Sequence, residues 1–333
     1  MSVYLAGDIG GTKTRLAAYA IKQRDCECVK QQKFPSKNYP NLRSIIKKFL
    51  ETETWRVHRA CFGIAGPVRG NISHATNLPW LVDAQQIAHD LCIETVALIN
   101  DLEAHAYGIK LLPEKEFSIL NEGDPSIEGN QAMISAGTGL GEAGIYFDGK
   151  HHYPFACEGG HGDFGPRNEL EDELLKYLRA KFQHVSYERI LSGPGLCNIY
   201  QFLIETKREK EKLDLFEEIQ RGDSARLISE MGMNQTSFAC MQALHLFASI
   251  YGSEAGNLAL KMFALGGVFL GGGIAPKILE VMKQGSFIEN FKKKGRFYDL
   301  LSQIPVKVSL NDQTALLGSF HYASKLMETP MRH

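Results

Sequence analysis

The sequence predicts a mixed α/β protein of two domains, and three observations support this. The chain has 333 residues, which is longer than one hydrophobic core usually serves. Short apolar segments typical of strands alternate with amphipathic segments of helical period. Two segments also share the order strand, glycine-rich turn, strand. This repetition suggests a duplicated architecture, although ordinary hairpin chemistry would produce the same pattern.

In the first half of the chain, the apolar pattern predicts a succession of strands and helices. Residues 41–50 carry apolar side chains on one helical face, and Asp83 is suited to cap a second, short helix. Strands are expected over 3–7, 15–20, 60–65 and 95–99.

The second half repeats this alternation. Helices are expected over 169–181 and about 236–263, and the charged stretch 206–212 fits a solvated helix face or a loop. Strands are expected over 132–135, 143–147 and 267–270. Because no Pro-rich or Ser-rich linker interrupts the chain, we expect short hinges between the domains.

The composition excludes several classes of protein. Hydrophobic residues make up 44% and charged residues 23%, and the formal net charge of -1 gives no global basic field for nucleic acid or anionic membrane. The seven cysteines form no CxxC pair, which indicates reduced thiols and a cytoplasmic location. Neither a signal peptide nor a run of about 20 apolar residues is present.

The turn Asp8-Ile9-Gly10-Gly11-Thr12 is the first candidate binding element. Glycines let main-chain N–H groups approach an anion, and Thr12 adds a hydroxyl donor. Asp8 suits such a site only with a cation between it and the phosphates, and Mg²⁺ is often held in this way. A plain hairpin turn fits the same residues. A P-loop and a dinucleotide fingerprint do not, because GxxxxGK[ST] is absent and a strand follows at Arg15.

Two further glycine turns follow predicted strands. Gly137-Thr138-Gly139 is a candidate second phosphate clamp, and Gly271-Gly272-Gly273 leaves room for an adenosine group against the main chain. Each also fits a simple turn. Three such turns at the ends of apolar strands are a stronger signal than any one of them.

Asn100-Asp101 stands at the end of a predicted strand, where α/β proteins usually place ligand residues. A carboxylate there can accept the proton of a hydroxyl group as its oxygen attacks phosphorus. The alternative is that Asp101 only caps a helix beginning at Leu102.

Other polar residues suit a sugar. Glu158-Gly159-Gly160-His161 offers two polar groups around a flexible pair of glycines, or else a surface turn. Glu188 is a second candidate, although it also fits a surface acid paired with Arg189. Asn77 and Trp80 suit the wall of a sugar site, but a structural tryptophan would look the same.

Together these segments resemble the bacterial glucokinase family, a branch of the hexokinase and actin-like ATPase group. The likeness extends from Tyr4 to about Gly318, and the order and spacing of the segments carry it. The segments are 7–12, 76–80, 99–101, 136–141, 158–161, 188–195 and 271–274.

The resemblance implies two α/β domains of the actin-like ATPase (ribonuclease H-like) type, with a sugar cleft between them. The small domain would comprise residues 1–110 and a C-terminal helix at about 312–330, and the large domain residues 111–311. The family also implies a homodimer.

The resemblance further implies ATP and Mg²⁺ as ligands and Asp101 as the catalytic base. Asp8 would hold the Mg²⁺ through water. The expected sugar-binding residues are Asn77, Asn100, Asp101, Glu158, His161 and Glu188. The expected ATP-binding residues are Gly7, Asp8, Ile9, Gly10, Gly11, Thr12, Gly137, Thr138, Gly139, Gly272 and Gly273.

Some features depart from this pattern. Lys13-Thr14 looks more like the related repressor–kinase (ROK) group, but the cysteine-rich zinc motif of that group is missing after His161. No helix-turn-helix segment precedes Tyr4, so a repressor is not expected. We therefore expect a zinc-free glucokinase that phosphorylates the 6-hydroxyl of glucose. The alternatives are a kinase for another hexose or an N-acetylhexosamine, and a non-catalytic sugar or nucleotide sensor.

Overall fold

The computed structural model describes residues 2–22, 25–211 and 213–326. The chain divides into two compact units. Unit 1 comprises residues 1–114 and 311–333, and unit 2 comprises residues 115–310. The predicted domains were 1–110 with 312–330, and 111–311. The end of the predicted C-terminal helix, after residue 326, lies outside the described residues.

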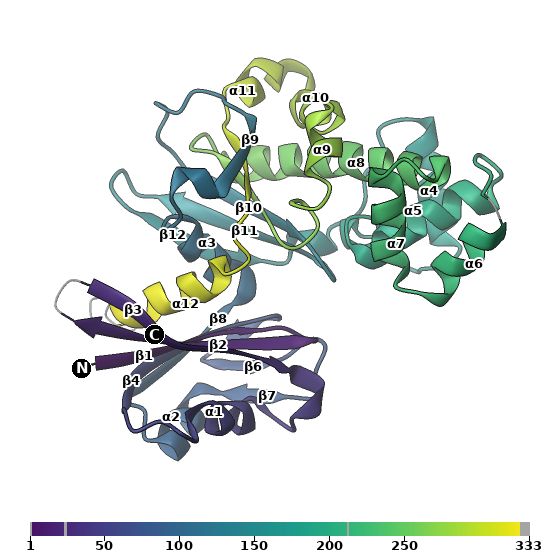
Figure 1. The fold of residues 1–333 in the computed structure, drawn as a ribbon. Coiled ribbons are helices and arrows are strands. Elements are labelled where there is room, and N and C mark those ends of the chain that lie inside the picture. Colours follow the sequence, from purple (N-terminus) through teal and green to yellow (C-terminus); the bar gives the residue numbers. More distant parts are fainter. Residues whose placement is uncertain (1, 23–24, 212, 327–333) are drawn as a thin grey trace. The chain divides into compact units, whose positions relative to one another are not determined.

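Unit 1 is built around a five-stranded sheet of order β3-β2-β1-β4-β8 (Figure 1). β1, β2 and β3 form an antiparallel meander, and β4 and β8 continue parallel to β1. The strands are β1 (Ser2–Ile9), β2 (Lys13–Lys22), β3 (Asp25–Pro35), β4 (Val57–Ile64) and β8 (Thr95–Asn100). A small second sheet contains β5 (Val68–Arg69), β6 (Ile72–His74) and β7 (Leu81–Asp83).

Both faces of the main sheet of unit 1 are covered, as the alternation along β4 shows. Ala60, Phe62 and Ile64 belong to a core with α1 and α2, whereas Cys61 belongs to a second core with α3 and α12. Successive side chains of a strand point to opposite faces, so one strand serves both cores. The helices are α1 (Leu42–Leu50), α2 (Ala84–Leu91), α3 (Asp101–Ile109) and α12 (Thr314–Lys325), with the 3₁₀ turn η1 (Ser36–Asn38).

The packing of α12 on α3 requires glycine. A Cβ atom at Gly318 would collide with the carbonyl oxygen of Ala104, and one at Gly108 would collide with that of Thr314. The two helices therefore approach main chain to main chain. Ser319 on α12 also donates from Oγ to the carbonyl oxygen of Gly7 at 2.9 Å, which ties α12 to β1.

Unit 2 contains a six-stranded sheet of order β12-β11-β10-β13-β14-β9. β10, β11 and β12 form an antiparallel meander, and β13 and β14 continue parallel to β10. The first five strands therefore have the same order and directions as the five strands of unit 1. The strands are β9 (Phe117–Asn121), β10 (Gln131–Ala136), β11 (Leu140–Phe147), β12 (His152–Cys157), β13 (Val268–Gly271) and β14 (Val306–Ser309).

Helices supply most of the remaining mass of unit 2. Its core includes most of α8, whose apolar residues are buried along nearly the whole helix. The helices are α4 (Glu169–Arg179), α5 (Gly193–Glu205), α6 (Leu213–Arg221), α7 (Ser224–Met233), α8 (Phe238–Met262), α9 (Leu279–Lys283), α10 (Ser286–Lys292) and α11 (Tyr298–Ser302). The 3₁₀ turns are η2 (Glu114–Glu116, at the boundary between the units in the sequence), η3 (Gly159–His161), η4 (Tyr187–Arg189) and η5 (Gly295–Phe297).

The structure confirms the α/β prediction and the repeated strand–glycine–strand units, and it corrects some boundaries. β1 continues through Asp8 and Ile9, and β11 begins at Leu140, because ladder hydrogen bonds extend each strand into the predicted turn. The charged stretch 206–212 is a loop as far as residue 211, and residue 212 lies outside the described residues. None of the described helices is long and apolar enough to cross a bilayer.

Candidate active site

The candidate residues of unit 1 gather where three parallel strands end. Ile9 of β1 is paired with Ile64 of β4, which in turn is paired with Asn100 of β8. The turn after β1 and the Asn100-Asp101 step therefore lie at one edge of the sheet. Ligand residues are expected at this carboxyl edge in open α/β sheets.

The glycine turn itself is shorter than predicted. Gly10 donates from its N–H to the carbonyl oxygen of Lys13 at 3.0 Å and accepts from Oγ of Ser36 at 2.7 Å. Within the described part of the chain, the N–H groups of Gly11 and Thr12 make no such bond, so they are the donors available to an anion.

Gly7 and Ile9 lie inside the fold instead of on the turn. The space beside Gly7 is filled by Phe62 and Leu16, and Ile9 is a core residue. These two residues of β1 are packed in the core and support the turn that follows them. The ladder bonds of β1 end at Ile9, so the turn proper comprises residues 10–12.

Asn77 lies directly over the turn. A Cβ atom at Gly11 would come within 2.5 Å of Cβ of Asn77, so the exposed Asn77 side chain stands beside the candidate phosphate site. Trp80 does not join it. Its side chain is buried in the core, and Nε1 donates to the carbonyl oxygen of Tyr39 at 3.2 Å. The structural tryptophan is therefore the correct alternative.

Asp8 is a carboxylate in a crowded position. Burial raises its pKa, and the charges of His105 and Arg15 offset this only in part, while Asp312 adds to it. Burial lowers the pKa of His105, and Arg15 is bound to the Asp312 carboxylate at 2.9 Å. A further cation beside Asp8 would therefore be favourable.

The residues present fit Mg²⁺ held mainly by phosphate and water. Asp8 offers one carboxylate next to a turn with free N–H groups, which suits the usual Mg²⁺ arrangement in nucleotide sites. Among the described residues, no three or more His, Cys, Asp or Glu side chains form a metal-binding group. The described residues thus offer no all-protein cage for the ion.

The Asn100-Asp101 step is a capped helix start. Asn100 is the N-cap of α3, and its Oδ1 accepts from the N–H of Leu102 at 2.9 Å. The carboxylate of Glu103 accepts in return from the N–H of Asn100, which completes a capping box. Asn100 is therefore the N-cap, one residue before the predicted alternative, and Oδ1 of Asp101 also accepts from the N–H of Leu102 at 3.0 Å. Asp101 is the first helical residue and is half-buried.

Asn100 is already engaged within the fold. Besides capping α3, it donates from Nδ2 to the carbonyl oxygen of Gly66 at 3.2 Å, and only 7% of the residue is exposed. Both polar atoms of its side chain therefore hold the loop and the helix that flank Asp101. A sugar contact from Asn100 stays a prediction.

In unit 2, the turn Gly137-Thr138-Gly139 lies beside a helix start. Gly193, the first residue of α5, donates to the carbonyl oxygen of Gly137 at 2.8 Å. The N-terminus of a helix carries partial positive charge and favours nearby anions. Thr138 is exposed at the tip of the turn. These features suit a phosphate clamp.

Gly272 and Gly273 lie next to the same region. A Cβ atom at Gly272 would come within 2.5 Å of the carbonyl oxygen of Ala136, at the end of β10. Gly272 also has a φ of 79°, a left-handed conformation that glycine adopts without strain. The structure thus brings the two glycine turns of unit 2 together at the carboxyl ends of β10 and β13.

Glu188 is held against the first of these turns. Its Oε2 accepts from the N–H of Leu140 at 3.0 Å. Arg189 instead stacks its guanidinium on Phe182, 4.3 Å from the ring centre. Glu188 is therefore not a surface acid paired with Arg189, which excludes the alternative considered from the sequence.

Glu158 and His161 are exposed at the two ends of the η3 turn, where their side chains are open to a ligand. The turn rests on β11, because a Cβ atom at Gly160 would collide with the carbonyl oxygen of Leu140. The structure therefore places Glu158, His161 and Glu188 around the first residues of β11.

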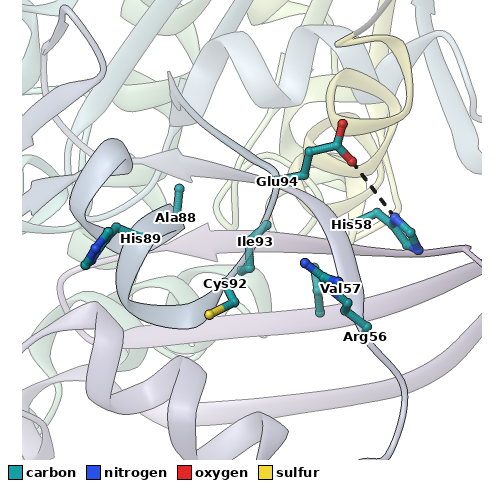
Figure 2. A pocket seen from close by; sticks show the side chains of 8 residues that line it. All are labelled: Arg56, Val57, His58, Ala88, His89, Cys92, Ile93 and Glu94. Carbon is teal, nitrogen blue, oxygen red and sulfur yellow. Dashed lines mark ion pairs between the residues drawn. The ribbon is translucent and has the colours of Figure 1, made fainter.

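A surface cavity of about 480 Å³ lies elsewhere in unit 1. Figure 2 shows the side chains that line it. It is lined at the beginnings of β4 and β8, by residues that include Arg56, His58 and Glu94, whereas Asp101 follows the end of β8. His58 and Glu94 face each other at 4.0 Å. The cavity is thus at the opposite edge of the sheet and takes no part in the candidate site.

Comparison with known proteins identifies the family. A family model described as Glucokinase matches residues 5–326. The glucokinase of Nostoc sp. strain PCC 7120 is 41% identical over 98% of this chain and 100% of the relative. The chain belongs to the glucokinase family. The glucokinase of Yersinia pestis strain Pestoides F is 36% identical to this family member, over 97% of both chains.

Solved structures agree with this assignment. A glucokinase from an Antarctic psychrotroph superposes with a TM-score of 0.83 at 28% identity, covering 98% of this chain and 99% of the other. A glucokinase of Balamuthia mandrillaris in complex with glucose shares the fold, with a TM-score of 0.82 at 20% identity and coverage of 97% and 94%. The predicted actin-like ATPase fold is confirmed, and as a family member the chain is an ATP-dependent sugar kinase.

The sequence analysis did not identify several residues that support the site or lie beside it. Glu103 follows Asn100 by three positions, which is a readable capping-box signal. Glu142 lies within an apolar strand and Glu254 within an apolar helix. An ionisable residue in an apolar segment indicates a buried acid with a specific partner. No neighbouring sequence pattern indicates the role of Ser36, which follows β3 and donates a hydrogen bond to the carbonyl oxygen of Gly10.

We expect Glu103 to make the stability of the chain depend on pH. Burial raises its pKa to about 7 from an ordinary 4.5, so folding favours the neutral acid. That contribution is complete below about pH 4.5 and is lost as the pH rises through about 7. Glu103→Gln should therefore match the wild type near pH 4.5 and exceed it by up to about 3 kcal/mol at about pH 8.

Urea unfolding at both pH values measures this effect. Glu51→Gln, at an exposed position of the same unit, is the control and should leave the pH dependence unchanged, because its partner Lys48 keeps its charge over this range. A difference between Glu103→Gln and the wild type that stays constant with pH would contradict the assignment.

Proposed function

We propose that this chain is a glucokinase, which transfers the γ-phosphoryl group of ATP to the 6-hydroxyl of D-glucose. The full-length identity of 41% to the Nostoc glucokinase supports this substrate. The Balamuthia structure holds glucose, and a ROK glucokinase of Streptomyces griseus with the same fold holds glucose and AMPPNP.

Asp101 is the proposed general base, and its position is the observation that carries the proposal. The carboxylate stands half-buried at the carboxyl edge of the sheet, on the first residue of a capped helix. Asn100 and Glu103 hold this helix start in one conformation. A sugar hydroxyl has a pKa far above neutral, so Asp101 takes the proton as the bond to phosphorus forms.

The remaining groups bind and orient the two substrates. Glu158, His161 and Glu188 would hold sugar hydroxyls, with Asn77 beside the turn of unit 1. The N–H groups of Gly11 and Thr12, and the turn of residues 137–139 at the start of α5, would hold phosphates. Asp8 would hold Mg²⁺ through water, and the ion would neutralise charge on the phosphates.

A comparison of sugars tests the substrate. A coupled assay for ADP with glucose, fructose, mannose and N-acetylglucosamine should give the highest kcat/KM for glucose. A higher value for another sugar would make the chain a kinase for that sugar. Binding of glucose without any release of ADP would instead favour the non-catalytic sensor.

The Asp101→Asn variant tests the base. It should lower kcat by about 10²-fold or more, because an amide cannot accept the proton. Glucose affinity, measured by calorimetry, should weaken only modestly, because the amide retains hydrogen-bonding capacity. Asp299→Asn, at an exposed position on α11, is the matched control and should keep full activity. Unchanged kcat in Asp101→Asn would exclude this role.

The Asp8→Asn variant tests the metal site. Loss of one carboxylate charge should raise the Mg²⁺ concentration needed for half-maximal rate by about tenfold and lower kcat. Isothermal titration of Mg²⁺ in the presence of a non-hydrolysable ATP analogue gives a second measurement that does not depend on turnover. A variant with wild-type Mg²⁺ dependence in both experiments would place the ion elsewhere.

A further inference from the structure

Three of the proposed sugar-binding residues are attached to one buried network in unit 2. Glu158 precedes Gly159, His161 precedes Gly162, and Glu188 follows Tyr187. Gly159, Gly162 and Tyr187 are linked to one another through hydrogen bonds and through two buried glutamates, Glu142 and Glu254.

The first link joins Glu142 to the η3 turn. Glu142 lies on β11 with 1% of its surface exposed. Its carboxyl group fills the space that a side chain at Gly159 would need, so the turn rests directly on this acid. A larger residue at position 159 would displace either the turn or Glu142.

The second link joins Glu142 to α8. Oε1 of Glu142 is buried without a partner among the described hydrogen bonds, and its carboxyl group lies near enough to that of the fully buried Glu254 for a bond between the two. Two carboxylates both lack a donor, so this bond requires a proton on one of them. Lys261 donates to Oε1 of Glu254 at 3.1 Å and Asn257 donates to Oε2 at 2.7 Å. Both oxygens of Glu254 therefore already accept hydrogen bonds, whereas burial raises the pKa of Glu142.

The third link returns to the η4 turn. Nδ2 of Asn257 also donates to the hydroxyl of Tyr187 at 3.1 Å. Lys294 donates to Oδ1 of Asn257 at 2.6 Å and to Oγ of Ser253 at 3.0 Å. A lysine accepts no hydrogen bond, so it determines which end of the Asn257 amide faces Tyr187.

Two main-chain hydrogen bonds close the ring. The N–H of Tyr187 donates to the carbonyl oxygen of Gly162 at 3.1 Å, and the N–H of Gly162 donates to that of Gly159 at 2.8 Å. The circuit thus runs through Gly159, Glu142, Glu254, Asn257, Tyr187 and Gly162. Each proposed sugar ligand of unit 2 is the chain neighbour of a member of this ring.

We propose that Glu142, placed between Gly159 and Glu254, is a positioning residue for sugar binding. It touches no substrate. It supports Gly159 and closes the ring that fixes Glu158, His161 and Glu188 relative to one another. This inference rests on the proposed function, because it takes those three residues as the sugar ligands.

The electrostatics of the ring predict how this support is lost. Burial, together with the charge of Glu254, raises the pKa of Glu142 to about 8. Loss of its proton would place two negative charges side by side under the turn. Among the described residues, other titratable groups that act on Glu142 or Glu254 include Lys261, Tyr251, Cys157, Tyr187 and Lys294. Of these, Lys294 also has a shifted pKa of about 8, so the test must separate it from Glu142.

The experiment compares Glu142→Gln and Glu142→Ala with the wild type, by measuring glucose KM and kcat between about pH 7 and about pH 9. Wild-type KM should rise about tenfold over this range, with kcat within about threefold of its value at neutral pH. Glu142→Gln mimics the neutral acid and should keep a low KM throughout, although Lys294 is still present. Glu142→Ala should show a KM raised about tenfold at every pH.

Glu171→Gln is the matched control, because Glu171 is equally buried but is paired with Arg167 outside the ring. It should lower stability and leave the glucose KM within about twofold of wild type. A wild-type KM in Glu142→Ala would overturn the proposal. So would a rise of KM with pH in Glu142→Gln that equals that of the wild type, since Lys294 would then be responsible.

Hydrogen exchange separates failure of this inference from failure of the proposed function. Main-chain amides of residues 159–162 should exchange at least about tenfold faster in Glu142→Ala than in the wild type or in Glu171→Gln. If the wild type phosphorylates none of the sugars, the proposed function fails and the exchange rates alone decide the role of Glu142. Equal exchange rates in the three proteins would overturn that role.

Discussion

The candidate active site depends on close approach of one stretch of main chain to another, at positions where only glycine fits. In unit 1, Gly108 and Gly318 let α12 lie directly on α3, although the two helices are far apart in the sequence. Asp101, the proposed base, is the first residue of α3, so this packing holds the helix that carries it against α12. In unit 2, Gly160 lets the η3 turn rest on Leu140 in the same way. Both contacts exclude any longer side chain, and this restriction is what gives the chemical groups a rigid support.

The two sheets share one strand order, but their edges carry different chemistry. The carboxyl edge in unit 1 holds Asp8 and Asp101, one beside a phosphate-type turn and one on a helix start. The corresponding edge in unit 2 holds two glycine turns and the three residues proposed to bind sugar hydroxyls. A duplicated scaffold can diverge in this way because the strands supply the framework, whereas the residues that follow each strand supply the chemistry.

Buried acids have a structural part in both units. Glu103 completes the cap that holds Asn100, and Glu142 supports the turn that carries Glu158. Each would be costly to bury as an anion, and in each case burial raises the pKa, so the neutral form becomes accessible near neutral pH. A neutral carboxylic acid can both donate and accept a hydrogen bond, which suits it to join two main-chain segments. Some titratable groups of this chain therefore support the segments that carry the proposed ligands, without being proposed ligands themselves.

The sequence by itself determined the α/β class, the cap at Asp83, the glycine turns and the elements with the clearest hydrophobic period, such as α1, α4 and α8, because hydrophobic period and capping act over a few residues. It also carried the resemblance to the glucokinase family. Only the tertiary structure decided how individual polar and aromatic residues are used. Trp80 is buried in the core, and Asn100 caps α3. Glu188 accepts a hydrogen bond from Leu140, and Glu142 lies near Glu254 of the distant helix α8. These outcomes depend on burial and on partners far along the chain, and no local pattern of residues encodes either of them.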